Sequence, residues 1–223
     1  MPALDPSRPH RFLVALAFVA LSMSLNACGL MGTRGEGAVT GETRQIDAFS
    51  RIESSGGFHV AVGFGPASSM KVSAQANILP LIVTEVVGGT LRIRSSKGFT
   101  TSERVDVTLT TSQLERIELT GGSRGDVDGL AANAFDVALS GGSVLTARGT
   151  AKSLVLGVSG GSVGELEGLT ASTIQVDLSG GSRVALRATD HVNGAASGGS
   201  RVRVAGGAEA NVNTTGGSQV EEH

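Results

Sequence analysis

The triplet Gly-Gly-Ser occurs six times in the carboxyl-terminal half of the chain, at nearly constant intervals. Its copies begin at residues 121, 141, 160, 180, 198 and 216, so the spacings are 20, 19, 20, 18 and 18 residues. Each copy follows a short segment in which apolar and polar residues alternate. A unit of this length is too short for a propeller blade or a helix pair, and it is typical of one coil of a parallel β-solenoid. The sequence therefore predicts an all-β repeat protein.

The alternating segments indicate which side chains face the core. Residues two apart in a strand share one face, and equivalent residues of stacked coils lie about 4.7–4.9 Å apart. The inward pairs should therefore form two columns. These pairs are Ile117/Leu119, Val137/Leu139, Leu156/Val158, Val176/Leu178, Gly194/Ala196 and Val212/Thr214. The small residues of the last two pairs predict a tapering end. A second short strand is expected after each triplet, marked by Val127, Val144, Val163, Val184/Leu186 and Val202/Val204.

The paired glycines are predicted to form the corners of the coils. A tight corner usually needs a positive φ angle, which glycine adopts without steric cost. Ser and Thr residues beside each pair can hydrogen-bond the backbone of the corner. The predicted corner residues are Gly121, Gly122, Gly141, Gly142, Gly160, Gly161, Gly180, Gly181, Gly198, Gly199, Gly216 and Gly217.

The composition limits the function classes. The chain has 223 residues, of which 40% are hydrophobic, and this is enough for a core. Its formal net charge of −2 gives no basic footprint for nucleic acid, so we expect no nucleic-acid partner. There is a single cysteine, and neither Cys nor His residues cluster, so no metal site and no cofactor are expected.

Residues 1–27 have the features of a signal peptide. Arg8 and Arg11 precede an apolar run over residues 12–25, which is too short to span a membrane comfortably. The run ends in Leu-Asn-Ala-Cys at residues 25–28, which resembles the lipobox of bacterial lipoproteins. This resemblance implies acylation of Cys28 and a membrane anchor. The residue after this cysteine is Gly29 rather than Asp, and the resemblance therefore implies a location in the outer membrane. Whether the protein faces the periplasm or the cell surface is left open. The alternative is an ordinary secretory peptide with an incidental cysteine.

The rest of the chain divides into a tether and one domain. Residues 28–43 are rich in glycine and lack a period, so a flexible tether is expected. The domain would span residues 44–223, with an irregular β half over 44–114 and the repeat half over 115–220. The predicted strands of the irregular half and the start of the repeat are 44–52, 58–63, 70–74, 82–87, 90–94, 104–110 and 114–119. At most one helical turn is expected, over residues 75–79 before Pro80. This half should cover the amino-terminal end of the stack.

The order of these segments resembles a known family. The runs at residues 44–52, 57–62, 76–79 and 89–93, followed by repeated Leu-Ser-Gly-Gly-Ser, are similar to the auto-transporter adhesin family with a head GIN domain. The resemblance covers residues 44–220. It implies a right-handed, β-helix-like envelope protein, often a lipoprotein, whose activity is not established. The chain departs from the family pattern in one column: the Asp common after the corner is replaced by Arg124, Val144, Val163, Arg183, Arg201 and Gln219.

Few residues are candidates for catalysis. Two carboxylate pairs with a spacing of two, Asp126/Asp128 and Glu165/Glu167, each share a strand face, as a glycoside hydrolase would need. The alternative is a solvated outer face, favoured by the absence of Trp and Tyr platforms. Asp190 and His191 are adjacent in sequence, so on a strand they would point to opposite faces, and no catalytic triad is expected.

Three arginines form the candidate contact for an anion or glycan. Arg183 and Arg201 should lie one rung apart, and Arg203 lies two residues further along. Adjacent guanidinium groups repel each other but suit a phosphate or carboxylate group. The alternative is that these side chains are simply solvated.

Three functions follow from these features. The favoured one is a non-catalytic, adhesin-like or scaffolding envelope lipoprotein that presents a polar surface to a glycan or protein partner. The alternatives are a polysaccharide-degrading β-helix enzyme and a structural protein that self-associates into a homo-oligomer through its carboxyl-terminal end.

Overall fold

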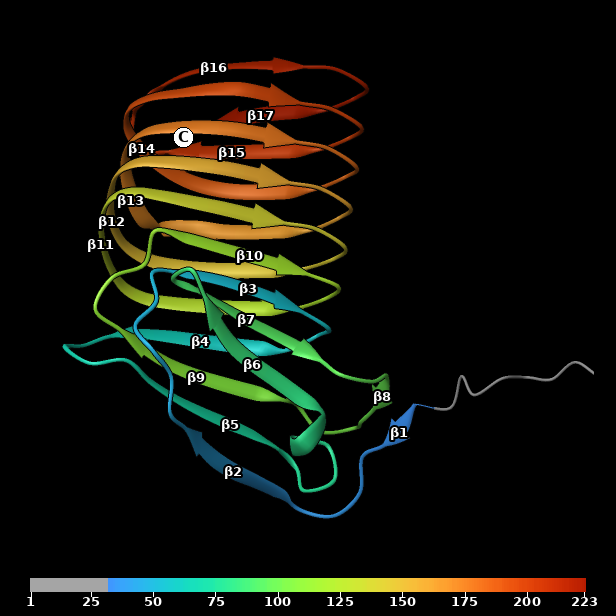
Figure 1. The fold of residues 1–223 in the computed structure, drawn as a ribbon. Helices are drawn as coiled ribbons and strands as arrows, with labels where there is room; N and C mark the ends of the chain where they lie inside the picture. Colours follow the sequence, from blue (N-terminus) through green and yellow to red (C-terminus); the bar gives the residue numbers. More distant parts are fainter. Residues whose placement is uncertain (1–31) are drawn as a thin grey trace, which may run out of the picture. The chain divides into compact units, whose positions relative to one another are not determined.

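The computed structural model describes residues 32–223, which form a stack of β-strand coils (Figure 1). The predicted signal peptide, residues 1–27, and the predicted lipidation site, Cys28, lie outside the described residues. Fifteen strands join in one sheet that wraps around the core, and β1 (Thr33–Arg34) pairs separately with β8 (Phe99–Thr100). The β-solenoid predicted from the Gly-Gly-Ser period is confirmed.

Each coil of the repeat half consists of one long, bent strand and one glycine corner. These long strands are β11 (Arg124–Leu139), β12 (Val144–Val158), β13 (Val163–Leu178) and β14 (Arg183–Ala196), and they pair in parallel with one another. The stack continues with β15 (Arg201–Ala205), β16 (Glu209–Thr214) and β17 (Gln219–Glu222). The sequence predicted a separate short strand after each corner, and β15 and β17 are such strands. In β11 to β14 the segment after the corner is instead joined to the next segment, because a shift in register at the bend, for example between Leu166 and Thr170, lets the strand turn without ending.

The two predicted core columns are confirmed. Val137, Leu156 and Val176 lie in register on neighbouring strands, and Leu139, Val158 and Leu178 do the same two residues later. All six side chains are buried. The columns also continue into the irregular half, where β10 (Arg116–Thr120), β3 (Arg51–Ser55) and β7 (Thr90–Ser95) pair in parallel. Burial decreases at the carboxyl-terminal end of the stack, where Val212 is half-buried and Thr214 is exposed. This agrees with the tapering end predicted from the small residues of the last two pairs.

The corner glycines behave as predicted. All twelve have φ between +60° and +78°. The serine after each of the first five pairs is buried, and its Oγ donates to the carbonyl oxygen three residues earlier at 2.7–2.8 Å. These bonds supply a hydrogen-bond donor to a carbonyl oxygen of the tight turn. The five serines are Ser123, Ser143, Ser162, Ser182 and Ser200.

The irregular half continues both faces of the stack and changes strand direction at its outer end. β9 (Asp106–Thr111) and β4 (His59–Phe64) pair in parallel and lead into β11. Antiparallel pairs then close the sheet: β5 (Ser69–Gln75) pairs with β9 and with β2 (Val39–Arg44), and β6 (Ile82–Val87) pairs with β7. In Figure 1, β2 lies at the end of the stack opposite β16. The expected cover at the amino-terminal end is therefore formed by antiparallel strands.

Three predictions for this half need correction. Residues 44–52 are not one strand, since β2 ends at Arg44 and β3 begins at Arg51. Strands β1 and β2 lie inside the segment expected as a tether, so regular structure begins before residue 44. The side chains of β2 are mostly exposed, and its backbone pairing with β5 therefore left no apolar period in the sequence. The helical turn is a 3-10 turn at Leu79–Leu81 rather than 75–79, because Pro80 fits the first turn of a helix.

One buried serine gives a stability prediction. Ser54 is 2% exposed, lies in a core column between Leu119 and Ile93, and its Oγ has no hydrogen-bond partner among the described residues. A buried polar atom without a partner costs about 1–3 kcal/mol. Ser54→Ala is therefore expected to raise the free energy of unfolding by about 1 kcal/mol, measured by urea denaturation. The matched control, Ser143→Ala, removes a 2.8 Å bond and should lower this free energy by a similar amount. Equal destabilisation by both variants would contradict the prediction.

Candidate functional site: a charged groove on the outer face

The outward side chains that follow the glycine corners form a regular column. Arg124, Val144, Val163, Arg183, Arg201 and Gln219 occupy equivalent positions on successive strands. The predicted juxtaposition of Arg183 and Arg201 is confirmed, because they are direct partners in the pairing of β14 with β15. Val144 and Val163, which marked the strand expected after each corner, are the half-buried members of this outward column, and Leu145 and Gly164 face the core beside them.

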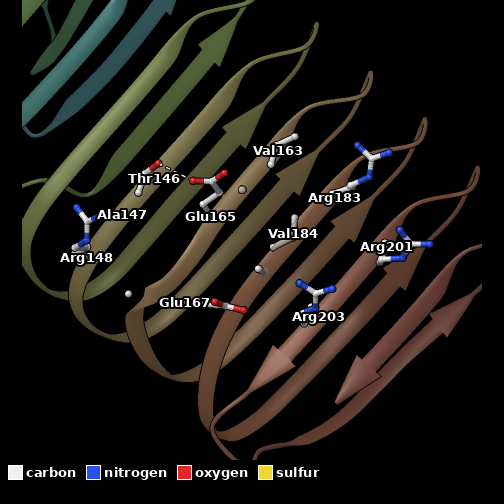
Figure 2. A pocket seen from close by; sticks show the side chains of 13 residues that line it. Thr146, Ala147, Arg148, Val163, Glu165, Glu167, Arg183, Val184, Arg201 and Arg203 are labelled. Atoms are coloured by element: carbon white, nitrogen blue, oxygen red, sulfur yellow. Dashed lines mark hydrogen bonds between the residues drawn. The ribbon is translucent and has the colours of Figure 1, made fainter. Parts of the chain in front are cut away.

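Next to this column lies a groove of about 510 Å³ that crosses β12 to β15 (Figure 2). Its centre is the small side chain of Ala185, which is in register with Glu165 on one neighbouring strand and Arg203 on the other. Arg183 precedes Ala185 by two residues on the same strand, so it lies on the same face. The short side chain of Ala185, together with Gly164 and Gly168, leaves room between the longer charged side chains.

The groove brings together two sets of residues that the sequence suggested as separate sites. Arg183, Arg201 and Arg203 line it, and so do Glu165 and Glu167. Glu165, Ala185 and Arg203 occupy equivalent positions after successive Gly-Gly-Ser triplets, so their alignment follows from the repeat register. The arginines and the glutamates were nevertheless predicted as separate sites. Arg148 of β12 lines the groove as well, so the acidic residues of β13 lie between basic residues of β12 and of β14 and β15.

The three arginines differ in their partners. Both Arg201 and Arg203 pair with Glu221, at 3.5 and 3.3 Å, and Arg201 also donates to the side-chain oxygen of Gln219 at 3.0 Å. These pairs are exposed and contribute little to stability, so a ligand can replace Glu221 at small cost. Within residues 32–223, no carboxylate lies within ion-pair distance of Arg183. Arg183 is thus a cation whose only neighbour in the next rung is another arginine.

The acidic side of the groove is formed by β13. Glu165 Oε2 accepts a hydrogen bond from Thr146 Oγ1 at 3.3 Å, as Figure 2 shows, and Glu167 is exposed two residues later. Both carboxylates retain acceptor sites that face solvent. They can accept hydroxyl or amine donors from a ligand.

The remaining candidates lie elsewhere. Asp126 Oδ2 is 2.6 Å from His59 Nε2, and His59 Nδ1 is 2.7 Å from Asp106 Oδ1. Arg104 Nε in turn lies 2.8 Å from Asp106. This cluster links β9, β4 and β11 and was not predicted, because its members are 47 and 67 residues from His59. Asp126 is therefore held by a histidine, and the pair Asp126/Asp128 does not line the groove.

His191 and Arg116 make local surface pairs. His191 Nδ1 lies 3.8 Å from Glu209, and the His191 side chain is exposed. Arg116 binds Glu118 and Asp136, and these hydrogen bonds, that to Glu118 foremost, raise the pKa of its guanidinium above the usual value. Arg116 therefore stays charged on the other face of the coils.

Residues 32–223 contain neither a side-chain cluster suited to a metal ion nor a helix suited to a membrane span. No group of three or more His, Cys, Asp or Glu side chains in this range is placed to hold a metal ion. In the same range, no helix has the length and apolar character needed to cross a membrane.

The stacked coils, glycine corners and charged groove define a β-solenoid with a polar surface site. The family model described as "Putative auto-transporter adhesin, head GIN domain" matches residues 48–208, and the chain belongs to this family. The resemblance in the sequence is thereby confirmed. No curated protein matches the chain significantly.

Solved structures share the fold at low sequence identity. A putative adhesin from Bacteroides fragilis is 16% identical, with a TM-score of 0.71 over 86% of this chain and 100% of that one. A putative adhesin from Parabacteroides merdae is 12% identical, with a TM-score of 0.56 over 86% and 98%. A putative lipid binding protein from Parabacteroides distasonis is 13% identical, with a TM-score of 0.54 over 85% and 98%. These likenesses concern the fold.

Proposed function

We propose that this protein is a non-catalytic, adhesin-like protein of the bacterial cell envelope, which presents the outer face of its solenoid to a macromolecular partner. The observation that carries the proposal is the groove over Ala185, where Arg183 has no acidic partner within residues 32–223. The family description and the adhesin names of similar folds support the same class of role. The flat, parallel strands offer a long surface on which many weak contacts can add up.

The proposal includes a lipid anchor at Cys28 in the outer membrane. Burial of acyl chains contributes about 0.8 kcal/mol per methylene, so two or more chains hold a protein firmly on a bilayer. In the producing cells, an alkyne fatty acid is expected to label the protein, and Cys28→Ala should abolish both the label and the membrane association. Protease added to intact cells then reports which side of the membrane carries the domain. An unlabelled wild-type protein that fractionates as soluble would overturn the anchor.

A polysaccharide-degrading enzyme is the second candidate, and a specific observation favours it. Glu165 and Glu167 lie in the same groove as the three arginines, where a bound acidic glycan would meet them. A reducing-sugar or unsaturated-product assay over common glycans distinguishes the two functions. Turnover that is lost in Glu165→Gln or Glu167→Gln would replace the adhesin-like proposal by catalysis.

Self-association through the carboxyl-terminal end is the third candidate. Within residues 32–223, β16 pairs only with β14 and β17 only with β15, so each has an outer edge without a partner strand. Such edges can pair with a second chain. Sedimentation of the protein with and without residues 211–223 tests this candidate, since a concentration-dependent oligomer that disappears on truncation would support it.

A further inference from the structure

We infer that the groove over Ala185 binds a carboxylated sugar, the uronic-acid type of unit found in acidic glycans. This inference rests on the proposed function and names the chemistry of its partner. Arg183 and Arg201 would bind the carboxylate, and Glu165 would accept hydrogen bonds from ring hydroxyl groups on the opposite side of Ala185.

The arginine side of the groove suits an anion. Arg183 and Arg201 are direct partners on neighbouring strands, and like charges placed opposite each other on a sheet are unfavourable. Arg201 contacts Gln219 and Glu221 on β17, whereas Arg183 has no carboxylate partner within residues 32–223. A planar carboxylate can accept the paired N–H donors of a guanidinium group in bidentate geometry. Binding would relieve the repulsion as well as form new hydrogen bonds. This pairing of like charges is therefore easier to explain with a ligand than without one.

The acidic side of the groove favours a ligand that is more than an anion. Glu165 and Glu167 line the same groove as four arginines, and a bare phosphate or sulfate would leave both carboxylates without a hydrogen-bond donor from the ligand. A ligand that fits both sides must carry hydroxyl donors beside its anionic group. A uronic acid has this arrangement on one ring, with a carboxylate on one side and neighbouring hydroxyl groups on the other.

The dimensions of the strands suit a single sugar ring. Neighbouring strands are about 4.7–4.9 Å apart, and residues i and i+2 of a strand are about 6.6 Å apart. Glu165, Arg203 and Arg183 surround Ala185 at these short spacings. The methyl group of Ala185 would provide a small apolar contact for the ring.

The composition argues for an acidic rather than a neutral glycan. The chain has no Trp and no Tyr, so the large aromatic platforms on which neutral sugars stack are absent from its sequence. The charged contacts would supply most of the affinity, and their exposure makes binding weak and salt-sensitive. A polymer with many uronic acid units compensates by rebinding along its length.

The test uses the full-length protein in detergent and measures binding at low salt by calorimetry. The probes are oligogalacturonate, the same oligosaccharide with its carboxyl groups reduced to alcohols, inorganic phosphate, and vesicles of anionic phospholipid. Binding of oligogalacturonate alone is expected. Equal or stronger binding of phosphate or vesicles would overturn the inference, since these probes lack the combination of carboxylate and ring hydroxyls.

Three variants locate the site. Arg183→Ala/Arg201→Ala should weaken oligogalacturonate binding at least about tenfold, because hydrogen bonds to charged groups contribute about 1.5–3 kcal/mol. Ala185→Gln fills the hollow without changing the charge and should weaken binding to a similar degree. Arg124→Ala is the matched control, since Arg124 lies in the same outward column but outside the groove, and it should leave the affinity within about twofold.

Two results would overturn the inference in different ways. If Ala185→Gln binds as the wild type does, the attraction is diffuse and no sugar site exists in the groove. A binding assay with isolated envelope material separates this failure from failure of the proposed function. Envelope binding that persists in Arg183→Ala/Arg201→Ala would leave the adhesin-like role standing and remove the sugar site. Absence of any envelope binding would overturn both.

Discussion

Leu156→Ala is expected to lower the free energy of unfolding by about 2–5 kcal/mol, which is a large part of the stability of a typical domain. Leu156 is 1% exposed and lies in the middle of a core column, between Val137 and Val176. Removing its side chain leaves a cavity that the stacked strands can close only partly, because each coil is held by its neighbours on both sides.

Val155→Ala is the matched control for this prediction. Val155 precedes Leu156 on the same strand, but its side chain points outward and is 47% exposed. Its truncation should change the free energy of unfolding by no more than about 0.5 kcal/mol. Urea denaturation followed by far-UV circular dichroism measures both variants. A larger loss from Val155→Ala than from Leu156→Ala would mean that the strand is out of register by one residue, which moves every core side chain to the solvent face.

Whatever repeats in this chain could be predicted from its sequence. A period of 18–20 residues with strict alternation fixes which side chains stack, so the core columns, the corners and the pairing of Arg183 with Arg201 follow from the printed order of residues. Each of these features depends only on the coil before and the coil after. Because each coil packs only on its neighbours, the small side chains of Ala196 and Thr214 were enough to predict the tapering end.

What does not repeat could not be predicted in the same way. The cluster of His59, Asp106 and Asp126 depends on β4 lying between β9 and β11, and no period in the sequence marks that order. β2 is held by its backbone pairing with β5, and its exposed side chains carry no apolar signal. The alignment of Glu165, Ala185 and Arg203 does follow from the repeat, but the groove does not, because a hollow depends on the sizes of side chains from four strands rather than on their period.

Gly194 is a position where an added methyl group is expected to lower the free energy of unfolding strongly. The sequence suggested a weak core position there, but the structure shows a backbone requirement. Its φ is +143°, a conformation that other residues rarely adopt. A Cβ atom would also collide with the backbone carbonyl oxygen of Val176, its partner on β13, and a carbonyl in a paired strand cannot move aside cheaply.

Gly194→Ala is therefore expected to cost about 2–6 kcal/mol, from about 1–3 kcal/mol of backbone strain and about 1–3 kcal/mol of steric overpacking. The loss of stability should extend toward the carboxyl-terminal end of the stack, because Gly194 also pairs with Val212 on β16. Hydrogen exchange should show lost protection over residues 209–214 before the coils of β11 and β12 are affected.

Gly157→Ala is the control that separates this steric argument from a general intolerance of the strands to added side chains. Gly157 lies on β12 and faces outward, its φ is not positive, and a Cβ atom there meets nothing within 4 Å. The substitution should be neutral or raise the free energy of unfolding by about 0.4–1 kcal/mol, since alanine restricts the unfolded chain more than glycine does. Thermal unfolding of the two variants beside the wild type provides the comparison. If Gly194→Ala were as stable as Gly157→Ala, the close approach of β13 and β14 at the rung of Gly194 and Val176 would be wrong.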